Sequence, residues 1–422
     1  MKFRIFLGAV LAVGLSALVA TASAQTRLVT LSDYLHAALK NNPLVGSASQ
    51  ASASAEYNSK AVRKGYYPQI GVGSHLIVAP GYDPAVTNGG EFGAQVSGSY
   101  TIYDGGSRGL EISKGNVGVE QGTLNQSVVK ADIIYSVSTT FVSAVREDRE
   151  LDVARQNYEQ LKDYLQLVNQ LHASGQGSET DVLKTTVDLN NARIDINARK
   201  VAIQNSLQAL AQASGLPTSF VTGVDTSAIS IPYDTTFDVV TNIDLQTRDL
   251  VFRQAILDAR LAESKLRPSV SLVGDAGALT SLPNIRPGLP DVFGASVGIA
   301  VSVPVFTFGS LQDSYLAAEA NAKSISMHND YDRLSLEREF DVTRNDIERA
   351  ESEIMSLQSN LVVAQQSYLL SKARYAGGSG LSLEVLDAIQ AVNQIRLAIE
   401  EARAQMQMSI LKLNRLNYSE EK

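Results

Sequence analysis

The chain lacks cysteine and tryptophan and is poor in aromatic residues. Its 422 residues include no Cys, no Trp and 6% aromatic residues. The absence of Cys excludes disulfides, thiolate metal sites and a lipid-modified N-terminal cysteine. Proline is absent from residues 85–216 and 305–422. Because proline breaks helix interiors, these two stretches are free to form unusually long helices.

The sequence also lacks the motifs of catalysis. It contains no G-x-S-x-G, H-E-x-x-H, P-loop or dinucleotide fingerprint. We therefore expect no enzyme activity, no cofactor and no metal. The formal net charge is −8, which argues against nucleic acid as a partner. The four histidines share no spacing typical of metal ligands; they are His36, His75, His172 and His328.

The N-terminus has the composition of a secretory signal. Lys2 and Arg4 precede an apolar stretch that ends in the small-residue pattern Ala22-Ser23-Ala24. The stretch is shorter than the ~20 residues that span a bilayer, which disfavours an uncleaved anchor. We predict a signal peptide over residues 1–24 and expect no membrane-spanning helix after it.

The two halves of the chain repeat one another at a separation of about 200 residues. Tyr67-Pro68 corresponds to Arg267-Pro268, and Phe92-Gly93-Ala94 corresponds to Phe293-Gly294-Ala295. From Tyr103 and Phe306 onward the separation is 203. Since one separation holds through prolines, glycines and helices, we infer a tandem duplication. It also relates two sets of apolar residues spaced by seven, as in supercoiled helices: Val137, Ala144, Leu151, Tyr158 and Leu165, and Phe340, Ile347, Ile354, Leu361 and Tyr368.

Each repeat is predicted to hold a short helix, a β-hairpin, a long helix and a second short helix. Amphipathic spacing predicts the helices, and alternation with a period of two predicts the strands. The first repeat covers residues 25–217, an equatorial linker 218–242 and the second repeat 243–422. The predicted elements are helices over 31–65, 110–173 and 179–214 with a hairpin over 68–104, then helices over 244–267, 310–376 and 381–417 with a hairpin over 269–306.

The predicted strands are apolar on one side and small or polar on the other. Phe92, Ala94 and Val96, for example, alternate with Gln95 and Ser97. This alternation suits a membrane barrel with a wet lumen, although a soluble sandwich would show it too. Four strands cannot close a barrel, because the smallest membrane barrels have about 8, and an open edge cannot face hydrocarbon. A barrel would therefore require several chains.

Three segments resemble the TolC family of outer-membrane efflux and secretion proteins, and the resemblance extends over essentially the whole mature chain. It implies a mainly α fold with a transmembrane β-barrel portion, in the outer membrane of a Gram-negative bacterium. In the implied homotrimer, each chain gives four strands to a shared twelve-stranded barrel above a long periplasmic tunnel of helices. The segments are Thr30-Leu31 with Asn42-Pro43, Tyr103-Asp104-Gly105-Gly106, and Arg374-Tyr375 with Gly378 and Glu384-Val385-Leu386-Asp387-Ala388.

The resemblance implies a passive duct set in outer-membrane lipid. A periplasmic adaptor would join it to an inner-membrane transporter, either an ABC transporter or a proton-driven pump. The cargo would be small toxic compounds in efflux, or proteins in type I secretion. A periplasmic adaptor protein or a surface coiled-coil protein remains an alternative. An adaptor would usually show one helical hairpin, whereas this chain has two.

The resemblance also places functional residues at the tips of the helical hairpins. Glu384 and Asp387 correspond to an acidic ring at the periplasmic aperture, which would favour cations. Acidic residues also suit any solvated helix start, because they lie at the positive end of the helix dipole. Tyr375 corresponds to a tyrosine that hydrogen-bonds an aspartate of a neighbouring hairpin, here Asp181, as a gate latch.

Glycines punctuate both predicted tips. The family uses these tips to meet the adaptor, although glycines at tight turns need no further explanation. The best-known relative has an arginine four positions before the ring acid, where this chain has Gly380. A latch held in the same way is therefore in doubt. The tip glycines, which we predict to face the adaptor, are Gly175, Gly177, Gly378 and Gly380.

Overall fold

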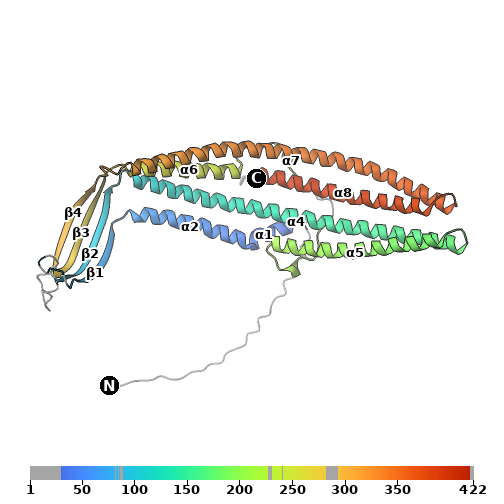
Figure 1. Cartoon of the computed structure of the whole chain (residues 1–422), viewed down its shortest axis with the longest axis horizontal. Helices are drawn as coiled ribbons and strands as arrows, with labels where there is room; N and C mark the ends of the chain where they lie inside the picture. The colour runs from blue at the N-terminus through green and yellow to red at the C-terminus, as the bar shows by residue number, and fades with distance from the viewer. Residues whose placement is uncertain are drawn as a thin grey trace, which may run out of the picture.

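The computed structural model describes residues 30–80, 82–83, 85, 89–226, 231–239, 241–281 and 293–418. The predicted signal peptide lies outside the described residues. The molecule is elongated, with a small sheet at one end and the turns of two helical hairpins at the other (Figure 1). Its elements are α1 (Leu31–Asn41), α2 (Pro43–Gly65), β1 (Gln69–Val78), β2 (Gly90–Tyr103), α4 (Ser107–Ala173), α5 (Glu179–Ala213), η1 (Thr218–Phe220), α6 (Ile243–Ser264), β3 (Ser269–Ser281), β4 (Phe293–Ser302), α7 (Ser310–Ala376) and α8 (Ser382–Leu416).

Two helices run the length of the helical part. Helices α4 and α7 have 67 residues each, about 100 Å at ~1.5 Å per residue. Helix α4 begins at Ser107 rather than at the predicted residue 110. The reason is Asp104, whose carboxylate accepts hydrogen bonds from the backbone N–H groups of Gly106 and Arg108. These bonds satisfy donors that have no partner within the first helical turn.

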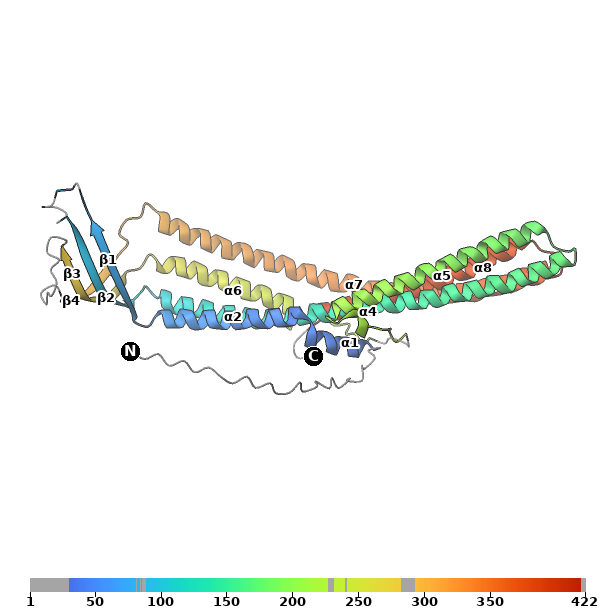
Figure 2. The same cartoon turned by 90° about the horizontal axis from the view of Figure 1, so that it is seen from below.

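The shorter helices stack end to end beside the long ones. Helices α2 and α5 lie in line along α4 (Figure 1 and Figure 2), and α6 and α8 lie in line along α7 (Figure 1). Helix α4 also packs against α6 and α8, so it joins the two repeats. The result is a curved wall of helices in which α5 and α2 form one flank and α7 forms the other.

The first short helix differs from the single helix predicted over residues 31–65. It is divided into α1 and α2 at Asn42, which is extended at φ −67° and ψ 124°. The next residue, Pro43, has no N–H for a helical hydrogen bond and disfavours helical geometry at the residue before it. Strand β4 ends at Ser302, ahead of the predicted boundary at 306 and of Pro304, since proline cannot donate to a ladder.

The four strands form one antiparallel sheet in the order β1-β2-β3-β4. Phe92 lies opposite Leu76 in the first hairpin, and Ala295 lies opposite Ala276 in the second. Leu76 and Ala276 correspond at the separation of 200 that relates Pro68 to Pro268, so their partners Phe92 and Ala295 correspond to each other. The sequence comparison, which matched Phe92 with Phe293, was wrong by two residues, because the loop of the second hairpin is three residues longer rather than one. One face of the sheet is apolar and open to the surroundings.

The hydrophobic core lies between the helices. The first heptad positions of each predicted seam are buried, with Val137 and Ala144 at 0% exposure and Ile347 at 1%. The later positions are only partly buried: Tyr158, Leu165, Ile354, Leu361 and Tyr368. Helix α4 contains a stretch long and apolar enough to cross a membrane, the one such stretch among the described helices, and 44% of it is buried. The expectation that no such stretch follows the signal was wrong, since the packing of α4 against several helices requires an apolar surface.

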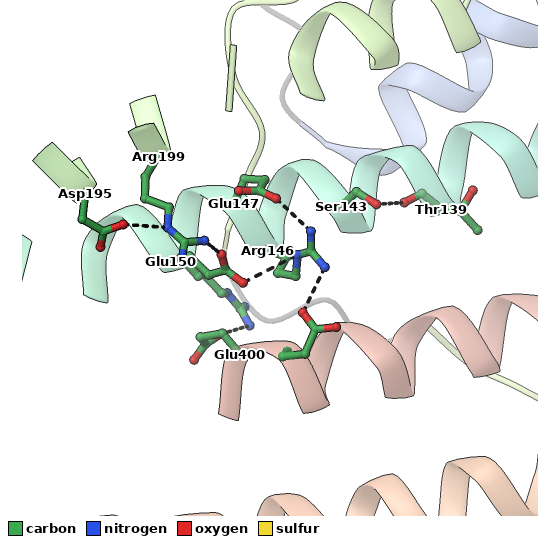
Figure 3. A network of polar contacts seen from close by, with 10 residues as sticks. Thr139, Ser143, Arg146, Glu147, Glu150, Asp195, Arg199 and Glu400 are labelled. Atoms are coloured by element: carbon green, nitrogen blue, oxygen red, sulfur yellow. Dashed lines mark hydrogen bonds and ion pairs between the residues drawn. The ribbon is translucent and has the colours of Figure 1, made fainter. Parts of the chain in front are cut away.

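An ion-pair network joins α4, α5 and α8 (Figure 3). The buried carboxylate of Glu150 accepts a hydrogen bond from Arg199 of α5. On the same helix, Arg146 donates to Glu147 and, at 2.9 Å, to Glu401 of α8. The network therefore fixes the first hairpin against the second.

Candidate functional site at the hairpin tips

The turn between α4 and α5 and the turn between α7 and α8 lie side by side at the end of the molecule remote from the sheet (Figure 1). Gly175 and Gly378 occupy matching places with φ of +78° and +73°. In each turn a backbone N–H returns to the preceding helix, from Gln176 to Leu171 and from Ser379 to Arg374. This geometry is the usual glycine-dependent end of a helix.

The other two tip glycines are needed because the backbone passes close by. A Cβ atom on Gly177 would lie 2.8 Å from the backbone nitrogen of His172, and one on Gly380 would lie 3.0 Å from that of Tyr375. A side chain at position 380, such as an arginine, would therefore require the end of α7 to shift by a few tenths of an ångström. The turns account for all four glycines, and their contact with an adaptor stays a prediction.

The structure brings Tyr375 and Asp181 together. The Tyr375 hydroxyl, on α7, donates to the carboxylate of Asp181, on α5, over 3.1 Å. Tyr375 is 7% exposed. Its burial, and then the charge of Asp181, raise the pKa of Tyr375, so the hydroxyl keeps the proton that it donates. The bond crosses from one hairpin to the other, and its role as a gate latch stays a prediction.

A second hydrogen bond, which the sequence did not reveal, lies beside the first. The hydroxyl of Tyr164, on α4, donates to the Oγ of Ser382, on α8, over 2.8 Å. Tyr164 is fully buried, and this burial raises its pKa. The rings of Tyr164 and Tyr375 lie 5.7 Å apart at 58°, a tilted arrangement that aromatic pairs favour. Together the two bonds tie α4, α5, α7 and α8 at the tips.

The two predicted ring acids have different surroundings. Glu384 lies in the first turn of α8, with its carboxylate 3.9 Å from the guanidinium of Arg374. Asp387, one turn later, is exposed and lines a groove of about 390 Å³ between α4, α5 and α8. Asp188 and Asp195 line the same groove, and burial raises the pKa of Asp195. The tips thus combine one paired acid with a carboxylate-lined groove.

No group of His, Asp or Glu residues in the described part of the chain is arranged to hold a metal ion. The groove that Asp387 lines also contains Lys184, and Arg199 pairs with Asp195, so basic side chains offset part of its negative charge.

The comparisons with known proteins agree with this architecture. The family model described as outer membrane efflux protein matches residues 34–216 and 240–417, one match to each repeat. No curated protein matches the chain. Because this family match covers most of the chain, it speaks against the two alternatives, a periplasmic adaptor protein and a surface coiled-coil protein.

Three solved structures show the same fold. The outer-membrane channel OprN has a TM-score of 0.79 at 19% identity, over 92% of this chain and 89% of its own. VceC, an outer membrane protein of Vibrio cholerae, has a TM-score of 0.78 at 16% identity, over 92% and 96%. The CmeC outer membrane channel of Campylobacter jejuni has a TM-score of 0.79 at 15% identity, over 93% of this chain and 87% of its own.

These matches confirm the predicted TolC-type fold, with long helices and a four-stranded antiparallel sheet in each chain. The family match also makes the protein an efflux protein of the outer membrane rather than an enzyme. The chain belongs to the outer membrane efflux protein family.

Proposed function

We propose that three copies of the mature chain form a passive duct that expels small toxic compounds across the outer membrane. The observation that carries this proposal is the open sheet. Within the described chain, β1 and β4 each pair on one side only, and their apolar face is bare, with Val72 at 84% exposure and Val297 at 81%. Lipid cannot satisfy the backbone groups of an open edge. Edge strands of neighbouring copies would satisfy them and close the barrel.

The flanks of the helical wall support the same assembly. On α5, Thr185 and Ala192 are buried toward α4, whereas Val187 and Ile194, about 200° around the helix from them at ~100° per residue, are 57% and 66% exposed. Burial of this apolar stripe against another helix would stabilise the protein.

The flank of α7 carries a similar stripe. Tyr368 packs into the core at the tips, while Leu370, on the opposite side of the helix, is 62% exposed. Val363, one heptad earlier, is 63% exposed. A second copy that brings its α5 flank against this α7 flank would cover both stripes.

The hairpin tips would then form the periplasmic entrance. In a trimer the carboxylates of Glu384 and Asp387 would repeat around the axis and attract cations to the constriction. The Tyr375–Asp181 bond would hold the tips together as a latch. A periplasmic adaptor would bind the tips and link them to an inner-membrane transporter, which supplies the energy that the duct itself lacks.

Deletion of the gene in the native cell tests the cargo. Loss of an efflux duct should raise the accumulation of dyes and detergents and the susceptibility to them, and the intact gene should restore resistance. We favour efflux over type I secretion because the family is described by efflux. If susceptibility is unchanged but a secreted protein is lost, the cargo is protein and the function is secretion. If neither susceptibility nor secretion changes, both functions are contradicted.

Cross-linking in the native cell tests the partners. We expect purification of the cross-linked duct to recover an adaptor and an inner-membrane transporter. Recovery of the duct alone, under conditions in which its own subunits are cross-linked efficiently, would count against a three-component pump.

A further inference from the structure

The tandem duplication relates each strand of the first hairpin to a strand of the second. Gln69 lies opposite Ser99 in the first hairpin, and Ser269 lies opposite Ser302 in the second. Pro68 and Pro268 set a separation of 200 for β1 and β3, and Tyr103 and Phe306 set one of 203 for β2 and β4. These opposed pairs agree with both separations. These two separations relate any pair of opposed residues in one hairpin to a pair in the other.

The contact between the two hairpins inside the chain is β2 with β3. Val96 lies opposite Ala276, and Ser97 lies opposite Asp275. In terms of the repeats, the second strand of one copy of the unit pairs with the first strand of the next copy. The edge strands β4 and β1 are again a second strand and a first strand, and each has one free side within the described sheet.

We propose that β4 of one subunit pairs with β1 of the next in the same register as β2 with β3. This inference rests on the homotrimer proposed above and goes beyond it by fixing which residues meet. The pair Val96–Ala276 becomes Ile299 opposite Leu76 of the next copy. The pair Ser97–Asp275 becomes Ala300 opposite His75 of the next copy.

The chemistry of the side chains fits this register. Ile299 is 67% exposed and Leu76 is 61% exposed, so two apolar side chains on the bare face of the sheet would become neighbours. Two residues along, Val297 would meet Val78, again with both apolar. A shift by a single residue would move one strand's whole apolar set to the opposite face. A shift of the register by two residues would leave every side chain on the same face of the sheet, so only the correspondence with β2 and β3 excludes it.

The proposed ladder between subunits ends earlier than the one inside the chain. Inside, the pairing continues past Thr101, opposite Ser271, to Tyr103 across a bulge. The counterpart of Thr101 is Pro304, which has no N–H to donate. We therefore infer that the seam between subunits has fewer backbone hydrogen bonds toward the helical side, and is the weaker line of the barrel.

The absence of native cysteine allows a direct test. Residues directly opposite on antiparallel strands have Cα atoms about 4.5–5.5 Å apart, within disulfide range. The double variant I299C with L76C should, on oxidation in detergent, give covalent dimers and trimers on a denaturing gel. The matched variant V96C with A276C, at the duplicated position, should oxidise within one chain and stay monomeric.

A register control distinguishes the possible failures. The variant I299C with V78C, shifted by two residues, should oxidise several-fold less than I299C with L76C. If the shifted variant is cross-linked more, the proposed register is wrong although the trimer stands. If the V96C and A276C pair oxidises but neither intersubunit variant is cross-linked in a protein of trimeric mass, β4 and β1 do not meet. If the protein has monomeric mass, the proposed function fails first.

Discussion

The side-chain amides of Asn42 and Asn242 make the same two contacts in the two repeats. Asn42 caps the start of α2 and donates to the carbonyl of Ala213, at the end of α5, over 3.0 Å. Asn242 caps the start of α6 and donates to the carbonyl of Leu416, at the end of α8, over 2.6 Å. Each asparagine therefore joins two stacked helices and keeps them in line along a long helix.

Removal of Asn242 should destabilise the protein. Asn242 is 2% exposed, so Asn242→Ala loses a cap, at about 1 kcal/mol, and leaves a buried carbonyl without a donor, at about 1–3 kcal/mol. Asn242→Ser keeps a capping oxygen and loses the amide donor, and should fall between the alanine variant and the wild type. Thermal unfolding followed by circular dichroism measures both. Two variants as stable as the wild type would contradict the joining role.

The network around Glu150 should contribute to stability. Glu150→Gln removes the negative charge that pairs with Arg199 and Arg146. The Glu150 side chain is only 9% exposed, so water screens this charge little. Hydrogen bonds to charged groups are worth about 1.5–3 kcal/mol, and we expect a loss in this range. Glu56→Gln is the control, because its pair with Lys60 is about half exposed and should cost at most about 0.5 kcal/mol. Equal losses would show that burial of the network does not matter.

The tip hydrogen bond should hold the duct closed. The double variant Tyr375→Phe with Asp181→Ala removes the donor and the acceptor, so the mean conductance of the purified protein in planar bilayers should rise. Tyr164→Phe is a useful comparison, since it breaks the neighbouring bond to Ser382 and should add to the effect. Conductance and gating that match the wild type in all these variants would exclude a latch at these residues.

The same hydrogen bond predicts the effect of alkaline pH. Folding raises the pKa of Tyr375 above its ordinary value, so its contribution to stability is fully present below about pH 10 and is lost as pH rises through the raised pKa. Conductance should therefore not change through this group between about pH 7 and 9, and should rise at higher pH in the wild type but not in Tyr375→Phe. The ultraviolet difference titration between these two proteins gives the pKa directly. A midpoint below 10 would contradict the inferred burial effect.

Charge at the tips should set ion selectivity. Because Arg374 lies 3.9 Å from Glu384, Arg374→Gln should leave the carboxylate unpaired and raise cation selectivity, whereas Asp387→Asn should lower it. The reversal potential under a salt gradient measures both, and the differences should be larger at low ionic strength. Glu56→Gln, on α2 and remote from the tips, should leave the reversal potential unchanged. The same potential in all four proteins would mean that the constriction lies elsewhere.

The long helices and the duplication could be predicted from the sequence because their signals are local. Heptads without proline specify α4 and α7, and they place Val137 and Ile347 in the core. The division of the first short helix could also have been predicted, since Asn42-Pro43 combines a capping residue with proline at the first helical position. The amphipathic pattern alone predicts one helix, because it continues across Pro43.

Contacts that depend on the rotation of one helix against another could not be predicted. The bond from Tyr164 to Ser382 joins residues 218 positions apart, and the pair of Arg199 with Glu150 depends on the phase of two separate helices. The pairing of Tyr375 with Asp181 follows from the family resemblance and not from the pattern of the residues themselves. From the sequence, Tyr164 is expected only to be an aromatic residue of the core, because it lies next to the heptad position Leu165.

The mass and conductance of the purified mature protein test the central claim most directly, because the described part of one chain offers four strands and four strands cannot close a barrel alone. We predict that light scattering in detergent gives the mass of three chains and that the same preparation forms long-lived pores in planar bilayers. A compact monomer of one chain's mass that forms no pore would contradict the account.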